Sequence, residues 1–296
     1  MHLSSSRAVI LATVMVVVSL ATGSAPAYAA SKPGAGQTST PVGNDVSYPN
    51  CTGTLPSKQA FAIVGVNDGL ANNTNPCLAK ELAWANTSTG TTVQPKSALY
   101  VNTANPSGVA GIAWWPTSNT FYDTTGTDSN SSGPGAVTVT VPVPTTYGTC
   151  SPAGSNDVAC AYVYGWAKAY DDVHYRNVPA RDPSGTAWMW WLDVETANSW
   201  ETTNLAANQA DLEAMAAYFK STGATVGLYS TSVQWNQITG NPPDTTLVSL
   251  PNWVPGARTL TGAISNCGLK GFTPNSPVTV TQYVSKIDYD YACKTA

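Results

Sequence analysis

Apolar runs that are typical of buried strands alternate along this chain with segments of helical periodicity. The strand-like runs lie at residues 61–67, 97–103, 188–196, 225–230, 250–254 and 278–284. Helical spacing of apolar side chains marks residues 77–85, 157–176 and 204–221. This alternation favours a largely parallel sheet, either closed into a barrel or doubly wound. No glycine-rich phosphate loop follows an early strand, which disfavours a nucleotide-binding doubly wound domain.

One long segment departs from this alternation. Residues 106–155 are rich in Gly, Ser, Thr and Pro, and only residues 136–142 have the alternating pattern of a strand pair. We expect this segment to form a long excursion between two elements of the main sheet.

The first 30 residues have the pattern of a secretory signal peptide. Arg7 precedes an apolar run over residues 8–21, and Ala27-Tyr28-Ala29 provides a cleavage site. The run is short for a membrane span, and no later stretch is long and apolar enough to be one. We therefore predict a secreted, extracellular protein that does not associate with a membrane after signal cleavage.

The rest of the chain is predicted to form a linker and one domain. Residues 31–43 are a flexible linker rich in Gly, Pro, Ser and Thr, and residues 44–296 suit one large α/β domain. The formal net charge is −4, with only 13 lysines and arginines. An acidic chain is a poor ligand for phosphate backbones, so we expect no nucleic-acid partner. We expect a monomer without a cofactor.

All six cysteines follow the signal peptide, and an even number of cysteines in a secreted chain indicates disulfide bonds. We predict sequential pairing: Cys51–Cys77, Cys150–Cys160 and Cys267–Cys293. A zinc site needs histidines or free thiolates at ligand spacing. Neither is present, so we predict no metal site.

His174 is the only histidine after the signal peptide, and it lies in the polar, helix-like stretch YDDVHYR. The chain has no nucleophile-elbow motif, so a surface histidine is expected rather than a Ser–His–Asp site. Carboxylates remain as the groups for acid–base chemistry.

The strand-like run WMWWLDVET ends in two carboxylates two positions apart. Because side chains alternate along a strand, Asp193 and Glu195 point to the same side, in line with Trp191. Carboxyl groups at this spacing can cooperate on one glycosidic bond. The same pattern also arises where a strand leaves the core and meets water, so the pair alone leaves both interpretations open.

Five motifs, in order along the chain, resemble those of glycoside hydrolase family 25, the Chalaropsis-type lysozymes. They are Gly43-Asn44-Asp45-Val46-Ser47, the run 61–69 with Asn75-Pro76, Leu192-Asp193-Val194-Glu195, Leu228-Tyr229-Ser230 with Trp235, and Gln282-Tyr283 with Ile287-Asp288. The chain also resembles related actinobacterial glycoside-hydrolase-like domains of unknown function.

This resemblance implies an α/β fold with a single TIM-like (β/α) barrel whose later strands are irregular. It implies a lysozyme-like muramidase that cleaves β-1,4 bonds of peptidoglycan by carboxylate acid–base catalysis. By position, Glu195 is the general acid and Asp193 orients the acetamido group of the substrate. Asp45 and Asp288 complete a ring of carboxylates.

Substrate binding is expected from aromatic faces and one amide. The candidates are Trp191, Tyr229, Trp253, Tyr283 and Gln282. For each aromatic side chain, packing in the core is the alternative role. For the whole protein, the alternative is a non-catalytic protein that binds cell-wall glycan on the same barrel. A purely structural surface protein is disfavoured, since it gives no reason for four acids at strand ends.

Overall fold

The computed structural model describes residues 41–91, 93–107, 114–123, 136–151, 157–176 and 189–294. The predicted signal peptide and most of the predicted linker lie outside these residues. Strand β1 (Val42–Val46) begins before the predicted domain start at residue 44. The last two residues of the predicted linker are therefore part of the sheet.

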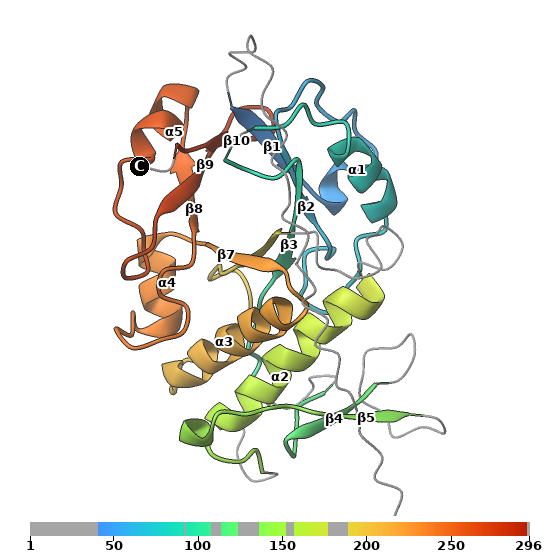
Figure 1. Ribbon diagram of the computed structural model, residues 1–296, viewed down its shortest axis with the longest axis vertical. Helices are drawn as coiled ribbons and strands as arrows, with labels where there is room; N and C mark the ends of the chain where they lie inside the picture. The colour runs from blue at the N-terminus through green and yellow to red at the C-terminus, as the bar shows by residue number, and fades with distance from the viewer. Residues whose placement is uncertain are drawn as a thin grey trace, which may run out of the picture. The chain divides into compact units, whose positions relative to one another are not determined.

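Eight strands close into a barrel, seen as a ring in Figure 1. Around the ring they follow the order β1-β10-β9-β8-β7-β6-β3-β2. Besides β1, they are β2 (Ala62–Gly65), β3 (Ser97–Asn102), β6 (Met189–Asp193), β7 (Thr225–Tyr229), β8 (Asn252–Ala257), β9 (Val278–Val284) and β10 (Asp288–Ala292). Neighbours are parallel, except that β10 is antiparallel to both β1 and β9. The predicted TIM-like barrel with irregular later strands is confirmed.

Helices connect most of the parallel strands. They are α1 (Leu78–Ala85), α2 (Val158–Asp171), α3 (Leu205–Ser221), α4 (Ser232–Thr239) and α5 (Leu260–Asn266). The first three were predicted. The last two are short and largely polar, so the apolar periodicity missed them. Each begins after a threonine, Thr231 or Thr259, whose side chain accepts a hydrogen bond from the first turn.

The long excursion carries a second sheet of two antiparallel strands, β4 (Thr120–Asp123) and β5 (Val137–Thr140). The prediction of a strand pair within residues 136–142 is therefore wrong. That segment supplies one strand, β5, and its partner β4 lies upstream, because seven residues are too few for two paired strands and the turn between them.

The excursion returns to the barrel through α2, which lies alongside α3 (Figure 1). Gly165 permits this close packing, since a Cβ atom there would lie 2.2 Å from the carbonyl oxygen of Asp211. A short π-helical turn, Asp172–Arg176, continues α2. The predicted helix at residues 157–176 therefore contains two kinds of turn.

Strand β6 separates two apolar cores, which explains its uninterrupted apolar sequence. Trp190 and Leu192 belong to the outer layer beneath the helices, where the Trp190 ring stacks on Phe219 at 4.4 Å. Trp191 points into the barrel and packs with Trp253. Gly227 on β7 leaves room for this ring, because a Cβ atom there would lie 2.3 Å from it.

Three disulfide bonds tie the chain together: Cys51–Cys77, Cys150–Cys160 and Cys267–Cys293. The sequential pairing predicted from the sequence is confirmed. Each bond is expected to stabilise the fold by about 2–4 kcal/mol, mainly by restricting the unfolded chain.

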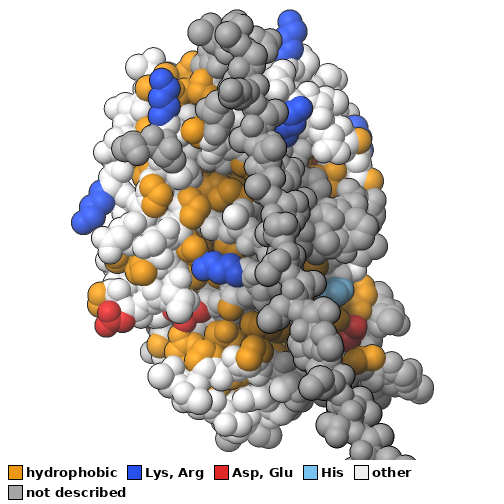
Figure 2. Space-filling view, in the orientation of Figure 1, with side chains coloured by type: hydrophobic (Ala, Val, Ile, Leu, Met, Phe, Trp, Pro, Cys, Tyr) orange, Lys and Arg blue, Asp and Glu red, His pale blue; other side chains and the backbone are white. Residues whose placement is uncertain are grey.

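The described surface has few charges. On the face shown in Figure 2, lysine and arginine side chains are scattered singly rather than gathered into a patch. None of the helices in the described part of the chain has the length and hydropathy of a membrane span.

Candidate active site

Asp193 is the last residue of β6 and lies at the carboxyl-terminal mouth of the barrel. It faces inward with Trp191, two residues earlier, and its side chain is buried. Its backbone carbonyl accepts hydrogen bonds from the amide and the hydroxyl of Thr103, at 3.2 and 2.6 Å. One carboxyl oxygen, Oδ1, has no hydrogen-bond partner among the described residues. The strand therefore presents a buried carboxyl group to the mouth.

Asp45 and Asp288 reach the same mouth from two other strands. Asp45 lies near the carboxyl end of β1, beside Ile63 of the interior core. Asp288 is the first residue of β10. Because β10 runs antiparallel to β1, its start lies at the end where β1 finishes. The Asn44 amide joins the two strands there, donating to the Asp288 carbonyl at 2.7 Å.

Glu195 lies just beyond β6 rather than in it, since the strand ends at Asp193. Its backbone is nevertheless firmly held. The Trp200 indole donates to the Glu195 carbonyl at 2.7 Å, and the Asn198 amide donates to the same oxygen at 3.2 Å. Val194 faces the outer core, so Glu195 turns toward the side of Asp193.

The proximity of these acids perturbs their protonation. Burial and then the charge of Asp288 raise the pKa of Asp45 to about 7. Burial, then Glu195 and Asp45, raise the pKa of Asp193 well above its ordinary value. Burial also raises the pKa of Glu195 and that of Asp288. The structure thus brings together all four acids predicted from the sequence, and it favours their protonated forms.

No cation balances this group within the described part of the chain. The ion pairs there join Lys168 and Arg176 to Asp171 and Asp172, and none of them includes an acid of the mouth. A cluster of carboxyl groups without basic partners holds some protons near neutral pH, and such a proton can be given to a leaving group.

Asp290 joins the acid group, and the sequence analysis missed it. It is fully buried on β10, opposite Gln282 of β9. Burial and then the charge of Asp45 raise its pKa well above the ordinary value. The alternation rule applied to Asp193 and Glu195 could have found it, because Asp288 and Asp290 are also two positions apart on one strand.

Two predicted binding residues form a hydrogen-bond chain to Asp45. The Tyr229 hydroxyl donates to Gln282 Oε1 at 3.1 Å, and Gln282 Nε2 donates to Asp45 Oδ2 at 2.9 Å. Tyr229 therefore fixes which way the Gln282 amide points. The donated bond from Gln282 lowers the pKa of Asp45, against the larger effect of burial.

The other predicted aromatic residues are buried or lie outside the barrel. Trp191 is 0 % exposed and Trp253 is 2 % exposed, so both pack inside the barrel, where the Trp253 ring meets the Tyr229 ring edge-on with centroids 4.6 Å apart. Tyr283 alternates with the inward-facing Gln282 and stacks on Tyr289 with ring centroids 5.1 Å apart. It therefore lies on the outer face of the sheet.

A cavity of about 430 Å³ lies at the other end of the barrel. Its lining includes Met189, Thr225 and Pro251, which stand at the beginnings of β6, β7 and β8. The acids stand at the opposite mouth, where the parallel strands end, so this cavity is separate from the candidate active site.

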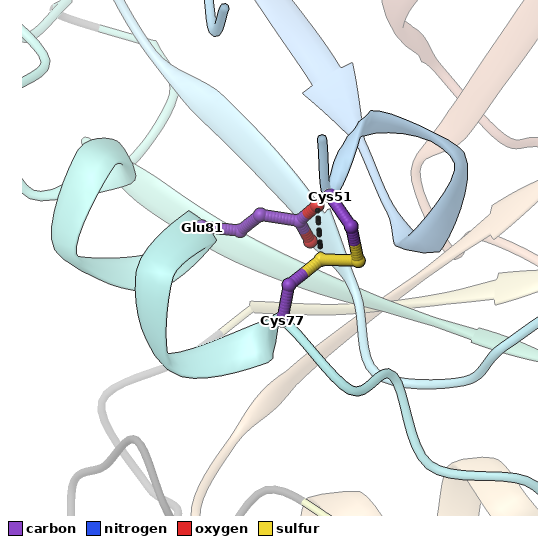
Figure 3. A group of neighbouring side chains, drawn as sticks. All are labelled: Cys51, Cys77 and Glu81. Atoms are coloured by element: carbon purple, nitrogen blue, oxygen red, sulfur yellow. Dashed lines mark hydrogen bonds between the residues drawn. A yellow bond between two sulfur atoms is a disulfide. The ribbon is translucent and has the colours of Figure 1, made fainter. Parts of the chain in front are cut away.

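One further group has ligand-type atoms close together. Cys51, Cys77 and Glu81 have sulfur and oxygen atoms within 4.8 Å of one another. Figure 3 shows that the two sulfurs are bonded, which leaves no thiolate for a metal. Glu81 Oε1 lies 3.1 Å from Cys77 Sγ, and burial raises the pKa of Glu81. A disulfide sulfur carries no hydrogen and can only accept a hydrogen bond. The contact therefore favours the protonated form of Glu81, which can donate one.

Comparison with known proteins points to the same strand. A family model described as Lysozyme-like protein 1 matches residues 180–253. That segment contains Asp193, Glu195 and Tyr229. The central part of the chain is thus similar to lysozyme-like proteins, in agreement with the resemblance seen in the sequence motifs. No curated protein matches the chain.

Two solved structures are similar to this one. A muramidase from Trichobolus zukalii has 15% sequence identity and a TM-score of 0.48, over 86% of this chain and 94% of that chain. The modular Cpl-1 endolysin, complexed with a peptidoglycan analogue, has 14% identity and a TM-score of 0.43. That match covers 86% of this chain and 54% of the endolysin, so the chain spans about half of that protein's length.

Proposed function

We propose that this protein is a secreted muramidase that hydrolyses β-1,4 glycosidic bonds of peptidoglycan. Glu195 is the general acid that protonates the leaving oxygen. Asp193 orients the acetamido group of the sugar, and Asp45 and Asp288 complete the carboxylate ring. The observation that carries this proposal is the meeting of four acids, from β1, β6, the segment just after β6, and β10, at one mouth of the barrel, with no basic partner among the described residues.

The environment of Glu195 suits proton donation. Burial raises its pKa, so Glu195 is protonated in a larger fraction of the molecules near neutral pH. Asp193 lies beside it, and the charge of Glu195 is one of the causes, after burial, that raise the pKa of Asp193. The match to lysozyme-like proteins over residues 180–253 supports the glycosidase class independently of this geometry.

Tyr229 and Gln282 are placed to contact the sugar substrate, which supports the same proposal. Both are at the mouth, and Gln282 links Tyr229 to Asp45, whereas Trp191 and Trp253 are buried in the barrel interior. We therefore assign sugar contact to Tyr229 and Gln282, and a packing role to the two tryptophans.

The reaction products test this function directly. Purified peptidoglycan is incubated with the protein and reduced with borohydride, and the sugars are then identified by mass spectrometry. We expect new reduced ends on N-acetylmuramic acid. Reduced ends on N-acetylglucosamine would contradict the bond assigned. Protein that pellets with several wall types and releases no reducing ends would favour the glycan-binding alternative.

A further inference from the structure

We propose that Gln234 is a positioning residue, which anchors the segment carrying Glu195 through two hydrogen bonds from Thr196 and so places the Glu195 carboxyl group. This inference rests on the proposed function of Glu195 as the acid. Gln234 lies in the first turn of α4, directly after β7, and was not singled out by the sequence analysis.

The position of Gln234 is fixed by its backbone. The amide of Gln234 donates to the hydroxyl of Thr231 at 3.1 Å, which caps α4. The next residue upstream, Ser230, donates from its hydroxyl to the Val194 carbonyl at 2.8 Å. The beginning of α4 is thus tied to the residue before Glu195, and the two segments cannot shift independently.

The orientation of the Gln234 side chain is fixed by Thr196. Its Oε1 accepts hydrogen bonds from the Thr196 amide at 2.7 Å and from the Thr196 hydroxyl at 3.0 Å. Because Oε1 is occupied on this side, Nε2 is the end of the amide that remains to serve the neighbouring Glu195 carboxyl. A hydrogen bond from an amide N–H favours the ionised carboxylate, and this interaction lowers the pKa of Glu195 against the effect of burial.

The other groups around Glu195 act in the opposite direction or not at all. Asp193 on β6 is an acid, and Asp45 on β1 acts on Asp193 in turn. Tyr229 on β7 is a neutral phenol whose pKa is raised by burial and by these charges. Helix α4 contains no titratable side chain. Gln234 is therefore the group at this corner that favours release of the Glu195 proton.

The test measures the Glu195 carboxyl itself, by NMR of protein labelled with ¹³C at the glutamate side-chain carboxyl. The chain has few glutamates to assign: Glu81, Glu195, Glu201 and Glu213. The variant Glu195→Gln identifies the resonance. In Gln234→Met we expect the titration midpoint of Glu195 to rise by about 0.5–1 on the pH scale. The alkaline limb of the pH–activity profile should move to higher pH by a similar amount.

Gln237→Met is the matched control, since it makes the same change on the exposed side of the same helix. Thr196→Val is a second, milder variant, because it removes one of the two bonds that orient the amide. It should raise the midpoint less, and it carries the test if Gln234→Met does not fold. A Glu195 midpoint that is the same in wild type and both site variants would overturn the inference. A midpoint that rises in Gln234→Met, together with a wild type that cuts no glycan, would support the inference while refuting the hydrolase.

Discussion

Two groups of buried acids in this protein differ in what surrounds them. At the end of α2, Asp171 and Asp172 lie beside two basic side chains, Lys168 and Arg176. At the barrel mouth, Asp45 belongs to a group with four other acids: Asp193, Glu195, Asp288 and Asp290. Among the described residues, no basic side chain pairs with this group. The pKa of Asp172 and that of Asp45 are both raised to about 7, with burial as the largest cause in each.

The secondary causes separate the two groups. Around Asp172, Arg176 lowers the pKa, Asp171 raises it and Lys168 lowers it, and the bond from Arg176 Nη1 to Asp172 Oδ1 is 3.2 Å. Around Asp45, Asp288 raises it further, and only hydrogen bonds oppose it. The α2 group is built as a structural ion-pair network. At the mouth, the acids repel one another and no basic side chain offsets this repulsion. Folding does not require such an arrangement, and acids with perturbed pKa values are concentrated at functional sites.

The largest effect should come from breaking the balanced group. Arg176→Met removes the ion pairs that Arg176 makes with the buried Asp171 and Asp172, so we expect the free energy of unfolding to fall by about 3–5 kcal/mol at pH 8. The loss should be smaller at pH 5, where Asp172 takes up a proton. Urea denaturation at both pH values measures this. Arg258→Met, at an exposed position, is the control and should change little.

A smaller effect of opposite sign is expected at the mouth. The pKa of Asp45 is higher in the folded protein than in the unfolded chain, so its contribution to stability is full below about pH 4. It is lost as the pH rises through about 7. Asp45→Asn should therefore leave stability near pH 4 unchanged and raise it by about 1–2 kcal/mol at pH 8, after allowance for partial exposure. Thermal unfolding across pH checks this.

Asp244→Asn is the control for that experiment, since Asp244 is exposed. If Asp45→Asn destabilised the protein at pH 8 as Arg176→Met does, the contrast between the two acid groups would be wrong.

The smallest effect concerns the hydrogen bonds that restrain the mouth. Tyr229→Phe removes the donor to Gln282 Oε1, so we expect a loss of about 1 kcal/mol in the free energy of unfolding. Tyr122→Phe, at an exposed position on β4, should be neutral. Equal stability of the two variants would show that the Gln282 amide does not depend on Tyr229.

The sequence contained most of the fold but only part of the site. Apolar runs identified β6 and β7, and helical spacing of apolar side chains identified α3, because these elements are buried against the cores. Short polar helices such as α4 escaped, and with them Gln234, whose role depends on a contact with the Glu195 loop. The acids Asp193 and Glu195 were found by spacing.

Burial could not be read at the level of single aromatic residues. Trp191 and Trp253 are aromatic residues of the kind that stack on sugars, yet both are buried in the barrel interior. Gly227 leaves room there for the Trp191 ring. Whether an aromatic residue faces the mouth or the floor depends on its depth along the strand, which the sequence pattern does not specify.

The most direct test of the central claim is the turnover of Glu195→Gln on purified peptidoglycan, compared with wild type at equal folded concentration. The amide keeps the shape of the side chain but has no acidic proton. We expect normal folding, retained binding to the wall, and a rate lower by about 10²–10⁴-fold. A Glu195→Gln variant that releases reducing ends at the wild-type rate would contradict the account.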